Sequence, residues 1–400
     1  MKKKLLFVIN TLGCGGAEKA LLALLGKLDE QKYEIHVLVM LGQGELVTEL
    51  PPHVRLLNKN YSPLSVLTKA GRRHLLHTMF SSFFKKAAGL RLLPYLCKNF
   101  FRMCIKRRIM LDKLLWRLLA ESRGDLEESY DLAMAWIEGA SAFYVADHVK
   151  AAKKVALVHI DYTAAGYDRQ LDGSRYLAYD RIFAVSDEVR ECFKKVYPER
   201  EDKLFILHNL IDQDYIRKQA KEEGGFDDDY DGIRLLTVGR LHYQKAYDIA
   251  IDTMALLKQA GILAKWYVLG EGDQRDTLEK KIEKLNLKSD FILLGVKENP
   301  YPYYAQTDIY VHCTRFEGKA LAIQEAQTLG CAVLASDCSG NREQITDGVD
   351  GLLCELSPEG IRDAILRLIE DHELRKRLGE AASHKSMAEE EELNRLLELI

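Results

Sequence analysis

The sequence predicts an α/β protein built from two domains, each with a parallel sheet covered by helices. Short apolar runs bounded by turn residues alternate with helix-length amphipathic segments along nearly the whole chain, as in parallel strands joined by helices. The chain has 400 residues, more than one hydrophobic core usually supports. The apolar runs also stop and begin again near its middle. We therefore expect two doubly wound, Rossmann-like domains that face each other across a ligand-binding cleft.

The first half contains apolar runs that we expect to be buried strands. They cover residues 5–9, 35–39, 132–136, 155–159 and 182–185. Acidic residues and glycines then replace the apolar rhythm at 211–231, where we expect the linker. The N-terminal domain is therefore expected at 1–210.

A second series of expected strands follows the linker. It covers residues 235–238, 266–269, 292–294, 309–312, 333–335 and 352–353. These runs place the C-terminal domain at 232–380. The remaining segment, 381–400, is helix-prone and acidic, and it can either pack back on the N-terminal domain or stay solvated.

Composition and charge exclude several classes of protein. A net charge of -3 gives no general attraction to nucleic acid. The apolar run at 5–9 is too short for a signal peptide, and no apolar stretch is long enough to span a bilayer, so we expect a cytoplasmic protein.

The 8 cysteines include no C-x-x-C pair, which argues against a zinc site or a disulfide framework. The acidic run at 227–229 lies in the expected linker rather than after a buried strand, so a solvated loop is favoured over a metal site.

A glycine-rich turn follows the first expected strand. Its residues, 13–18, open an amphipathic helix. Glycines such as Gly15 and Gly16 let the backbone approach a ligand, and the free N–H groups of a helix N-terminus suit a phosphate or a sugar oxygen. A tight strand-to-helix turn without a ligand is an equal alternative.

Two cations follow the first strand of the second domain. Gly239 and Arg240 end that strand, and Lys245 precedes the next helix. Cations at the carboxyl edge of a parallel sheet are suited to neutralising a diphosphate and could replace a metal ion there. The alternative is a pair of solvated surface charges.

A third motif carries two carboxylates. Glu317 lies in the loop after the strand at 309–312, and Glu325 lies in the first two turns of the next helix. Both can therefore point into one site near the sheet edge. Carboxylate oxygens accept strong hydrogen bonds from sugar and ribose hydroxyls.

His159 ends an apolar strand of the N-terminal domain, and Asp161 follows it closely. A histidine in that position is as often a hydrogen-bonded core residue as a functional one. The nearby carboxylate favours function. Asn209 is expected to be a hinge or turn residue at the entry to the second domain.

Together these motifs resemble the family 4 glycosyltransferases, which have the GT-B fold of two Rossmann-like domains. The N-terminal matches resemble the bacterial members that build polysaccharides. The resemblance is carried by Gly15-Gly16-Ala17-Glu18, Ile137-Glu138-Gly139, Leu157-Val158-His159-Ile160-Asp161, Gly239-Arg240-Leu241 with Lys245, Gly270-Glu271-Gly272, the Glu317 to Glu325 spacing, Val333-Leu334-Ala335-Ser336-Asp337 and Gly351-Leu352-Leu353.

The resemblance implies a metal-independent transfer of a sugar with retention at the anomeric carbon. It implies catalytic or charge-stabilising roles for Arg240, Lys245, Glu317 and His159. It implies donor binding by Gly15, Gly16, Gly239, Gly318, Lys319, Ala320, Leu321 and Glu325, and acceptor-side positions for Glu138 and Asp161. Lys319-Ala320 departs from the aromatic or aliphatic residue and proline common in the family, which leaves the donor sugar open.

The implied partners are a nucleotide-sugar donor, with UDP the commonest nucleotide in the family, and a glycan or lipid-linked acceptor. The donor is a substrate, so no cofactor is expected. Two other functions stay open: a nucleotide-sugar epimerase or hydrolase, which would need no acceptor, and a non-catalytic nucleotide-sugar-binding subunit, which should lack site residues.

Residues 69–117 form a basic, apolar segment inside the first domain, within a helical insertion expected at about 65–120. Aromatic and aliphatic residues are interleaved with Arg72, Arg73, Lys85, Lys86, Arg91, Lys98, Arg102, Lys106, Arg107, Arg108 and Lys113. One interpretation is an insertion that packs on the domain with its charges solvated. The other is a docking face for the anionic inner leaflet, which would make the protein peripheral to the membrane.

Overall fold

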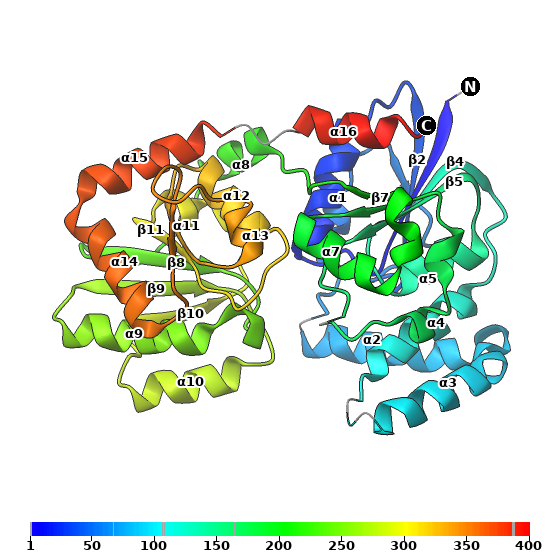
Figure 1. Cartoon of the computed structure of the whole chain (residues 1–400), viewed down its shortest axis with the longest axis horizontal. Helices are drawn as coiled ribbons and strands as arrows, with labels where there is room; N and C mark the ends of the chain where they lie inside the picture. The colour runs from blue at the N-terminus through cyan, green and yellow to red at the C-terminus, as the bar shows by residue number, and fades with distance from the viewer. Residues whose placement is uncertain (1, 67, 106, 108, 164, 386–388) are drawn as a thin grey trace. The chain divides into compact units, whose positions relative to one another are not determined.

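The protein divides into two compact units. The computed structural model describes residues 2–66, 68–105, 107, 109–163, 165–385 and 389–400. The N-terminal unit comprises Met1–Leu210 and Ala388–Ile400, and the C-terminal unit comprises Ile211–Met387 (Figure 1). Lys106 and Arg108 of the basic segment lie outside the described residues.

The N-terminal unit contains a parallel sheet of 7 strands in the order β3-β2-β1-β4-β5-β6-β7. Its central strands are apolar on both faces because helices cover both sides of the sheet. The strands are β1 Lys3–Ile9, β2 Tyr33–Val39, β3 Val54–Leu56, β4 Ser129–Ala135, β5 Lys150–Val158, β6 Arg181–Ala184 and β7 Leu204–Ile206.

Amphipathic segments between these strands form the helices. Side-chain caps begin several of them: the Ser186 hydroxyl, for example, accepts the Val189 N–H at the start of α7. The helices are α1 Gly16–Lys27, α2 Lys69–Phe84, α3 Ala88–Ile105, α4 Leu111–Arg123, α5 Ala140–His148, α6 Arg169–Asp172, α7 Asp187–Val196 and α16 Glu389–Leu397.

The C-terminal unit repeats the architecture with 6 parallel strands in the order β10-β9-β8-β11-β12-β13. The strands are β8 Ile233–Val238, β9 Ala264–Leu269, β10 Phe291–Gly295, β11 Ile309–His312, β12 Ala332–Ser336 and β13 Leu352–Cys354. The helices are α8 Gln213–Gln219, α9 Tyr247–Gln259, α10 Arg275–Lys284, α11 Tyr301–Ala305, α12 Leu321–Thr328, α13 Ser339–Arg342, α14 Pro358–Glu370 and α15 His372–Ser383.

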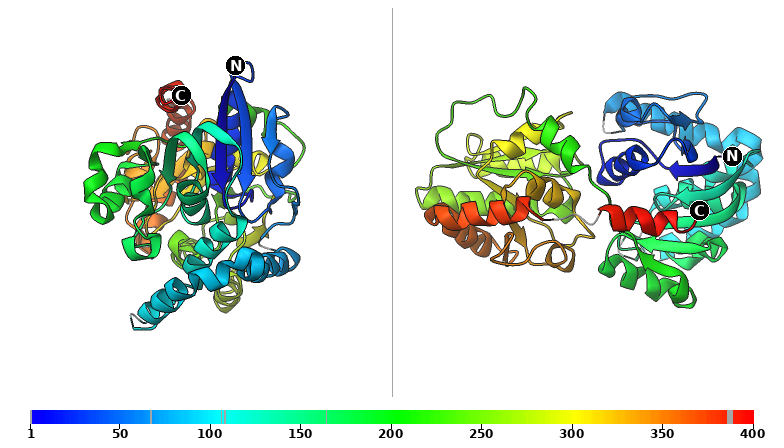
Figure 2. Two further views of the ribbon diagram at one scale, coloured as in Figure 1. Left: turned by 90° about the vertical axis from the view of Figure 1, so that its right-hand side faces the viewer. Right: turned by 90° about the horizontal axis from the view of Figure 1, so that it is seen from above.

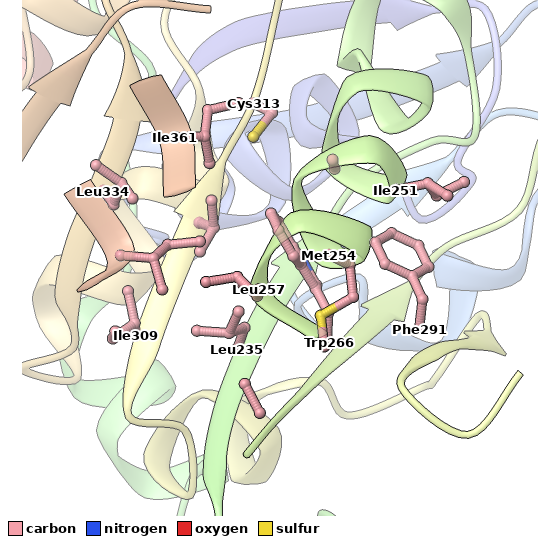
Figure 3. Packing of buried hydrophobic residues seen from close by; sticks show 14 of the residues in the cluster. Leu235, Ile251, Met254, Leu257, Trp266, Phe291, Ile309, Cys313, Leu334 and Ile361 are labelled. Carbon is pink, nitrogen blue, oxygen red and sulfur yellow. The ribbon is translucent and has the colours of Figure 1, made fainter. Parts of the chain in front are cut away.

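A core of buried aliphatic and aromatic side chains fills one side of this second sheet. Leu235, Trp266 and Ile309 from the strands pack against Met254 and Leu257 of α9 (Figure 3). The indole N–H of Trp266 donates to the Thr237 hydroxyl at 2.9 Å, so the largest core side chain leaves no polar group unsatisfied. This core fixes β8 and β11, the two strands that lead into the candidate site.

The predicted fold of two Rossmann-like parallel sheets is confirmed. The expected strands missed β3 and β7, which are edge strands of 3 residues each. Runs this short give no measurable periodicity. The stretch 211–231, expected as a linker, contains α8 and lies in the C-terminal unit, whereas α16 lies in the N-terminal unit.

The insertion forms α2, α3 and α4. In two perpendicular views these helices lie at the end of the N-terminal unit opposite the chain termini (Figures 1 and 2). Helix α4 ends beside the carboxyl end of β2, because Arg123 donates to the carbonyls of Val39, the last residue of β2, and of Met40, which follows it. Among the described residues, none of the helices has the length and apolar character needed to cross a bilayer.

Candidate functional site

The strand order places a ligand-binding position in each unit. In each sheet the order reverses between two neighbouring strands, β1 and β4 in the first and β8 and β11 in the second. Loops leave such a switch point in opposite directions and open a crevice at the carboxyl ends of the strands. The predicted site residues of the C-terminal unit follow β8 and β11; in the N-terminal unit Gly15, Gly16 and Glu138 follow β1 and β4, and His159 and Asp161 follow the adjacent β5.

The turn after β8 is built by close backbone contacts. The Tyr247 hydroxyl donates to the Gly239 carbonyl at 2.8 Å. Gly270, with φ +149°, approaches so closely that a Cβ there would lie 2.0 Å from the Gly239 oxygen. A Cβ on Gly272 would likewise lie 2.2 Å from the Leu241 oxygen. The Gly270-Glu271-Gly272 motif therefore supports the backbone of the Gly239-Arg240 turn.

Lys245 and Glu317 come together at this switch point as an ion pair. Their loops are joined by hydrogen bonds: Gln244 Nε2 donates to the Phe316 carbonyl at 2.8 Å, and the Arg315 N–H donates to the Gln244 carbonyl at 2.8 Å. The Arg315 side chain, bound to Asp248, reinforces the contact. Folding thus brings a cation and a carboxylate of two separate motifs into one place.

The Glu317 carboxyl is ionised in this setting. Burial alone would raise its pKa, but the Lys245 charge and the hydrogen bond to His312 outweigh burial and hold the pKa down to about 2. Its side chain is only 13% exposed and that of Lys245 only 16%. Each of these two partly buried charges is therefore stabilised by the other.

The other predicted donor-side residues surround this pair. Arg240 ends the β8 turn with an exposed side chain, and no carboxylate of the described residues forms an ion pair with it. Ala320 is the N-cap of α12, and Leu321 begins that helix. Lys319 is half-buried. A Cβ on Gly340 would lie 2.2 Å from the Gly318 oxygen, so α13 packs directly on the Glu317-Gly318 backbone.

Glu325 lies in α12 and is 5% exposed. Its carboxylate accepts hydrogen bonds from the Tyr301 hydroxyl at 3.2 Å and the Tyr304 hydroxyl at 3.0 Å. Both tyrosines belong to α11. These bonds orient the carboxylate before any ligand arrives.

His312 is a site residue that the motif argument missed. It is the last residue of β11, and its Nε2 atom lies 3.2 Å from Glu317 Oε2 and 3.4 Å from Lys245 Nζ. The available signal was a histidine at the end of an apolar strand, the feature that singled out His159.

In the N-terminal unit, Gly15 and Gly16 form the turn into α1, where Gly15 is the N-cap without a side-chain hydrogen bond. Glu18, in the first turn, accepts a hydrogen bond from the Thr11 hydroxyl at 2.9 Å. A Cβ on Gly15 would meet the Glu18 carboxylate at 2.4 Å. Glycine therefore leaves room for that carboxylate beside the helix N-terminus.

Glu138 and His159 also lie together. Glu138 Oε1 accepts the His159 N–H and, at 3.1 Å, the Ile160 N–H. Burial raises the Glu138 pKa to about 7 despite these bonds, and burial lowers the His159 pKa to about 4. His159 Nε2 lies 3.2 Å from Asn209 Oδ1, while its Nδ1 has no hydrogen-bond partner among the described residues.

Asp161 occupies the turn after this strand. Its carboxylate accepts hydrogen bonds from the Thr163 N–H at 3.0 Å and the Thr163 hydroxyl at 2.9 Å. Asn209, expected as a hinge or turn residue, holds the His159 ring through its side chain. Helix α4 borders the same region, because a Cβ on Gly139 would lie 3.0 Å from the Trp116 ring.

Two acidic groups away from the switch points have other partners. Asp228, from the run weighed above as a metal motif, binds Arg234, Lys265 and the Tyr267 hydroxyl. Glu34, His36 and Glu128 have possible metal-ligand atoms within 4.8 Å of one another. Lys4 Nζ lies 3.5 Å from both of those glutamates, at the amino ends of β1, β2 and β4.

The chain resembles proteins of one enzyme class. Residues 218–385 match the family described as Glycosyl transferases group 1. The N-acetylgalactosamine-N,N'-diacetylbacillosaminyl-diphospho-undecaprenol 4-alpha-N-acetylgalactosaminyltransferase of Campylobacter jejuni is 27% identical over 395 residues, covering 96% of this chain and 95% of the relative. The lipopolysaccharide core biosynthesis glycosyltransferase LpsE of Rhizobium meliloti is 24% identical over 275 residues, covering 68% and 75%.

Solved structures show the same fold. HepE of Anabaena, in complex with UDP and glucose, has a TM-score of 0.65 at 16% identity, with 99% of this chain and 98% of that chain covered. TarM has a TM-score of 0.66 at 13% identity, with 100% and 99% covered. The two-domain arrangement predicted from the motifs is thus the fold of known GT-B proteins.

Proposed function

We propose that this chain, a glycosyltransferase with the GT-B fold, moves a sugar with retention from a UDP-sugar to a lipid-linked or polysaccharide acceptor. The observation that carries the proposal is the Lys245–Glu317 ion pair at the switch point of the C-terminal sheet. A cation and a carboxylate, held side by side at the carboxyl edge of parallel strands, match the two halves of a nucleotide-sugar donor: an anionic diphosphate and a hydroxyl-rich sugar.

Arg240 and Lys245 would bind the diphosphate and stabilise the charge that develops on it as the glycosidic bond breaks. Such fixed charges are worth more in a partly dry site than in water. They supply the neutralisation that a divalent metal ion provides elsewhere, so the reaction would need neither a metal nor a cofactor. UDP is the nucleotide of the HepE complex and the commonest one in the family.

Glu317, with the backbone of Gly318 to Leu321, would hold the donor sugar, and Glu325 would bind the ribose hydroxyls. The ionised state of Glu317 suits this role because a carboxylate accepts hydrogen bonds from two hydroxyls at once. Tyr301 and Tyr304 already orient Glu325, which lowers the ordering cost of binding the ribose.

The N-terminal unit would supply the acceptor side. Gly15 and Gly16 present the N-terminus of α1, and His159 would lie near the reacting centre. With Nε2 donating to Asn209, the Nδ1 atom is the acceptor nitrogen of the ring; it is buried and has no hydrogen-bond partner among the described residues, so a sugar hydroxyl could bind it only after a local rearrangement. Glu138 and Asp161 would shape the acceptor position.

The insertion would dock on the anionic inner leaflet and bring the enzyme to a lipid-linked acceptor. The relative from Campylobacter jejuni carries diphospho-undecaprenol in its name. Leu76, Phe80 and Phe84 of α2 are 70%, 69% and 65% exposed, and Arg72 and Arg73 lie on the same exposed stripe of the helix. A basic, apolar helix face of this kind is typical of interfacial membrane binding.

A donor and acceptor screen tests the proposal. We expect UDP release from one UDP-sugar that depends on a lipid-linked or glycan acceptor, yields a product with the donor's anomeric configuration, and persists in excess EDTA. Conversion of the donor without any acceptor would point to an epimerase or hydrolase. Donor binding without turnover over a full acceptor panel would favour a binding subunit. Loss of activity in EDTA that is restored by a metal would contradict metal independence.

A further inference from the structure

His312 is buried beside Lys245 and Glu317 in the donor-side site, yet the proposed reaction gives it no role. It is 1% exposed and ends β11. Its Nδ1 atom lies 3.1 Å from the Tyr310 hydroxyl, and its Nε2 atom lies 3.2 Å from Glu317 Oε2. A buried imidazole needs partners on both nitrogens, and these two groups provide them.

The neighbours of His312 determine which nitrogen carries the proton. Burial, together with the nearby Lys245 charge, lowers the pKa of His312, so the ring is neutral. The ionised Glu317 carboxylate can only accept hydrogen bonds, so the His312 Nε2 atom that faces it must be the donor, and Nδ1 is left to accept from the Tyr310 hydroxyl. The imidazole proton therefore lies on Nε2, where it donates to Glu317.

Glu317 thus has two donors on one carboxylate oxygen, the Lys245 ammonium group and the His312 Nε2–H. A donor diphosphate would compete with Glu317 for Lys245. If Lys245 turned to the phosphate and no other donor remained, Glu317 would be a partly buried charge without a partner, and such a group tends to take up a proton or move.

We propose that His312 is a positioning residue, which holds the Glu317 carboxylate in place and ionised when Lys245 turns to the diphosphate of the donor. This inference rests on the proposed function, because it takes Lys245 as the diphosphate ligand. The second oxygen, Oε1, then stays directed at the sugar. Tyr310 acts through His312 by selecting the tautomer that donates.

The test compares His312→Leu with His312→Gln. Leucine keeps most of the volume and removes the donor, whereas the glutamine amide can place an N–H near the position of Nε2. We expect kcat in His312→Leu to fall about tenfold to a hundredfold, as for the loss of one oriented donor. The Kd for UDP should rise as well, because the diphosphate of UDP also takes Lys245 from Glu317 and leaves that carboxylate without a donor. His312→Gln should recover most of kcat.

The pH profile separates positioning from packing. Without the His312 donor, the pKa of Glu317 in the donor complex should rise, because burial then opposes ionisation with less compensation. The acid limb of kcat should therefore move to higher pH in His312→Leu and much less in His312→Gln. The titratable or charged groups near Glu317 on adjoining elements are Lys245, His312, Tyr310, Arg315 and Lys319.

Two tyrosine variants complete the test. Tyr310→Phe removes the donor to Nδ1 and should move the acid limb upward by less than His312→Leu does. Tyr267→Phe is the matched control, because that buried hydroxyl binds Asp228 away from the site and its loss should leave the profile unchanged. If His312→Leu does not fold, Tyr310→Phe carries the test, and a wild-type acid limb in that variant would overturn the proposal.

Other outcomes are equally decisive. Wild-type kcat in a folded His312→Leu variant overturns the positioning role. Equal losses in the leucine and glutamine variants, with unchanged acid limbs, show that His312 only packs. Absence of acceptor-dependent transfer in the wild type would refute the proposed function itself, whereas full transfer by Lys245→Ala would refute only the role of Lys245 as diphosphate ligand, so the failures are distinguishable.

Discussion

The Lys245 ammonium group is ion-paired with the Glu317 carboxylate although 72 residues separate them in the chain. The pair forms because β8 and β11 are neighbours at the switch point of the C-terminal sheet and their following loops are hydrogen-bonded together. A diphosphate that reaches this site meets a cation already desolvated by its partner. Binding then requires an exchange of partners for Lys245, and little new ordering of its side chain.

Removing either donor-side cation should impair transfer, with different effects on stability. We expect Arg240→Ala and Lys245→Ala each to lower kcat at least a hundredfold, because each removes charge stabilisation from the leaving diphosphate. Lys245→Ala should also cost about 2 kcal/mol of unfolding free energy, since Glu317 loses its buried ion-pair partner. Arg240→Ala should change stability by less than about 0.5 kcal/mol, because its side chain is exposed.

Steady-state kinetics and urea unfolding measure these two effects. Lys258→Ala is the control, because that lysine forms a surface ion pair with Asp290. Wild-type turnover in both the Arg240 and the Lys245 variants would show that the diphosphate binds elsewhere.

The two motif carboxylates should have separable roles. We expect Glu325→Gln to weaken binding of free UDP by about tenfold, because a charged acceptor of the ribose hydroxyls becomes a weaker neutral one. Glu317→Gln should weaken binding of the UDP-sugar while leaving the affinity for UDP nearly unchanged. Calorimetry with both ligands measures the difference. Equal losses of UDP affinity in the two variants would mean that this division of roles is wrong.

The fold was predictable from sequence because buried parallel strands consist of continuous apolar residues. The apolar runs at residues 5–9 and 309–312, for example, lie in β1 and β11. The donor-side residues were predictable as far as they follow strands, since strand ends meet at one edge. His312 was missed because its partners, Tyr310 and Glu317, are set by strand register and loop packing, which no local pattern encodes.

The same reasoning explains other gaps. Gly340 was not singled out, although its missing side chain lets α13 pack on the Glu317 backbone. That contact depends on how two distant loops meet. Glu138 was predicted to lie near the acceptor substrate. Its hydrogen bonds from the His159 and Ile160 N–H groups could not be predicted, because they depend on β4 and β5 being neighbours in the sheet.

Gly270 should be irreplaceable in the donor-side turn. A methyl group there would lie 2.0 Å from the Gly239 oxygen, and its φ of +149° strains any other residue. We expect Gly270→Ala to cost about 3 kcal/mol of unfolding free energy and to weaken UDP binding. Gly261→Ala is the matched control, with φ +73° and nothing within 4 Å, and should cost only about 1 kcal/mol. Equal costs in the two variants would show that the close approach to Gly239 is relaxed in solution.

Asp172 should make the N-terminal unit lose stability as the pH rises. Burial raises its pKa to about 7, although the Tyr162 and Tyr197 hydroxyls donate to it. The unfolded chain releases this proton first, near pH 4, so unfolding gains an advantage until the pH passes about 7. Asp172→Asn removes the titration. From pH 4 to pH 8 its stability relative to wild type should rise by about 3 to 4 kcal/mol. Denaturant unfolding at both values measures the change, and a constant difference would contradict the shift.

The exposed face of α2 is one part of the insertion suited to membrane binding, and α3 exposes further apolar side chains. Leu76, Phe80 and Phe84 project from one stripe, and the ring centroids of Phe80 and Phe84 lie 5.2 Å apart although both side chains are exposed. Isolated exposed apolar residues are ordinary, but a stripe of them beside Arg72 and Arg73 is not. The charges would meet anionic headgroups and the rings would enter the interface.

Liposome co-sedimentation tests this docking with two variants. The triple variant Leu76→Ser, Phe80→Ser and Phe84→Ser should bind more weakly to vesicles rich in anionic lipid, because it removes the apolar surface of α2 that would enter the interface. The double variant Arg72→Gln and Arg73→Gln should bind more weakly, by about tenfold to thirtyfold, since each basic residue near the surface contributes roughly 1 kcal/mol. Wild-type binding should fall as salt is raised. Leu263→Ser is the control, because that side chain is 78% exposed but isolated in the C-terminal unit. Equal binding of wild type to neutral and anionic vesicles, or no binding to anionic ones, would contradict docking on an anionic membrane and would favour a protein as the partner of the exposed stripe.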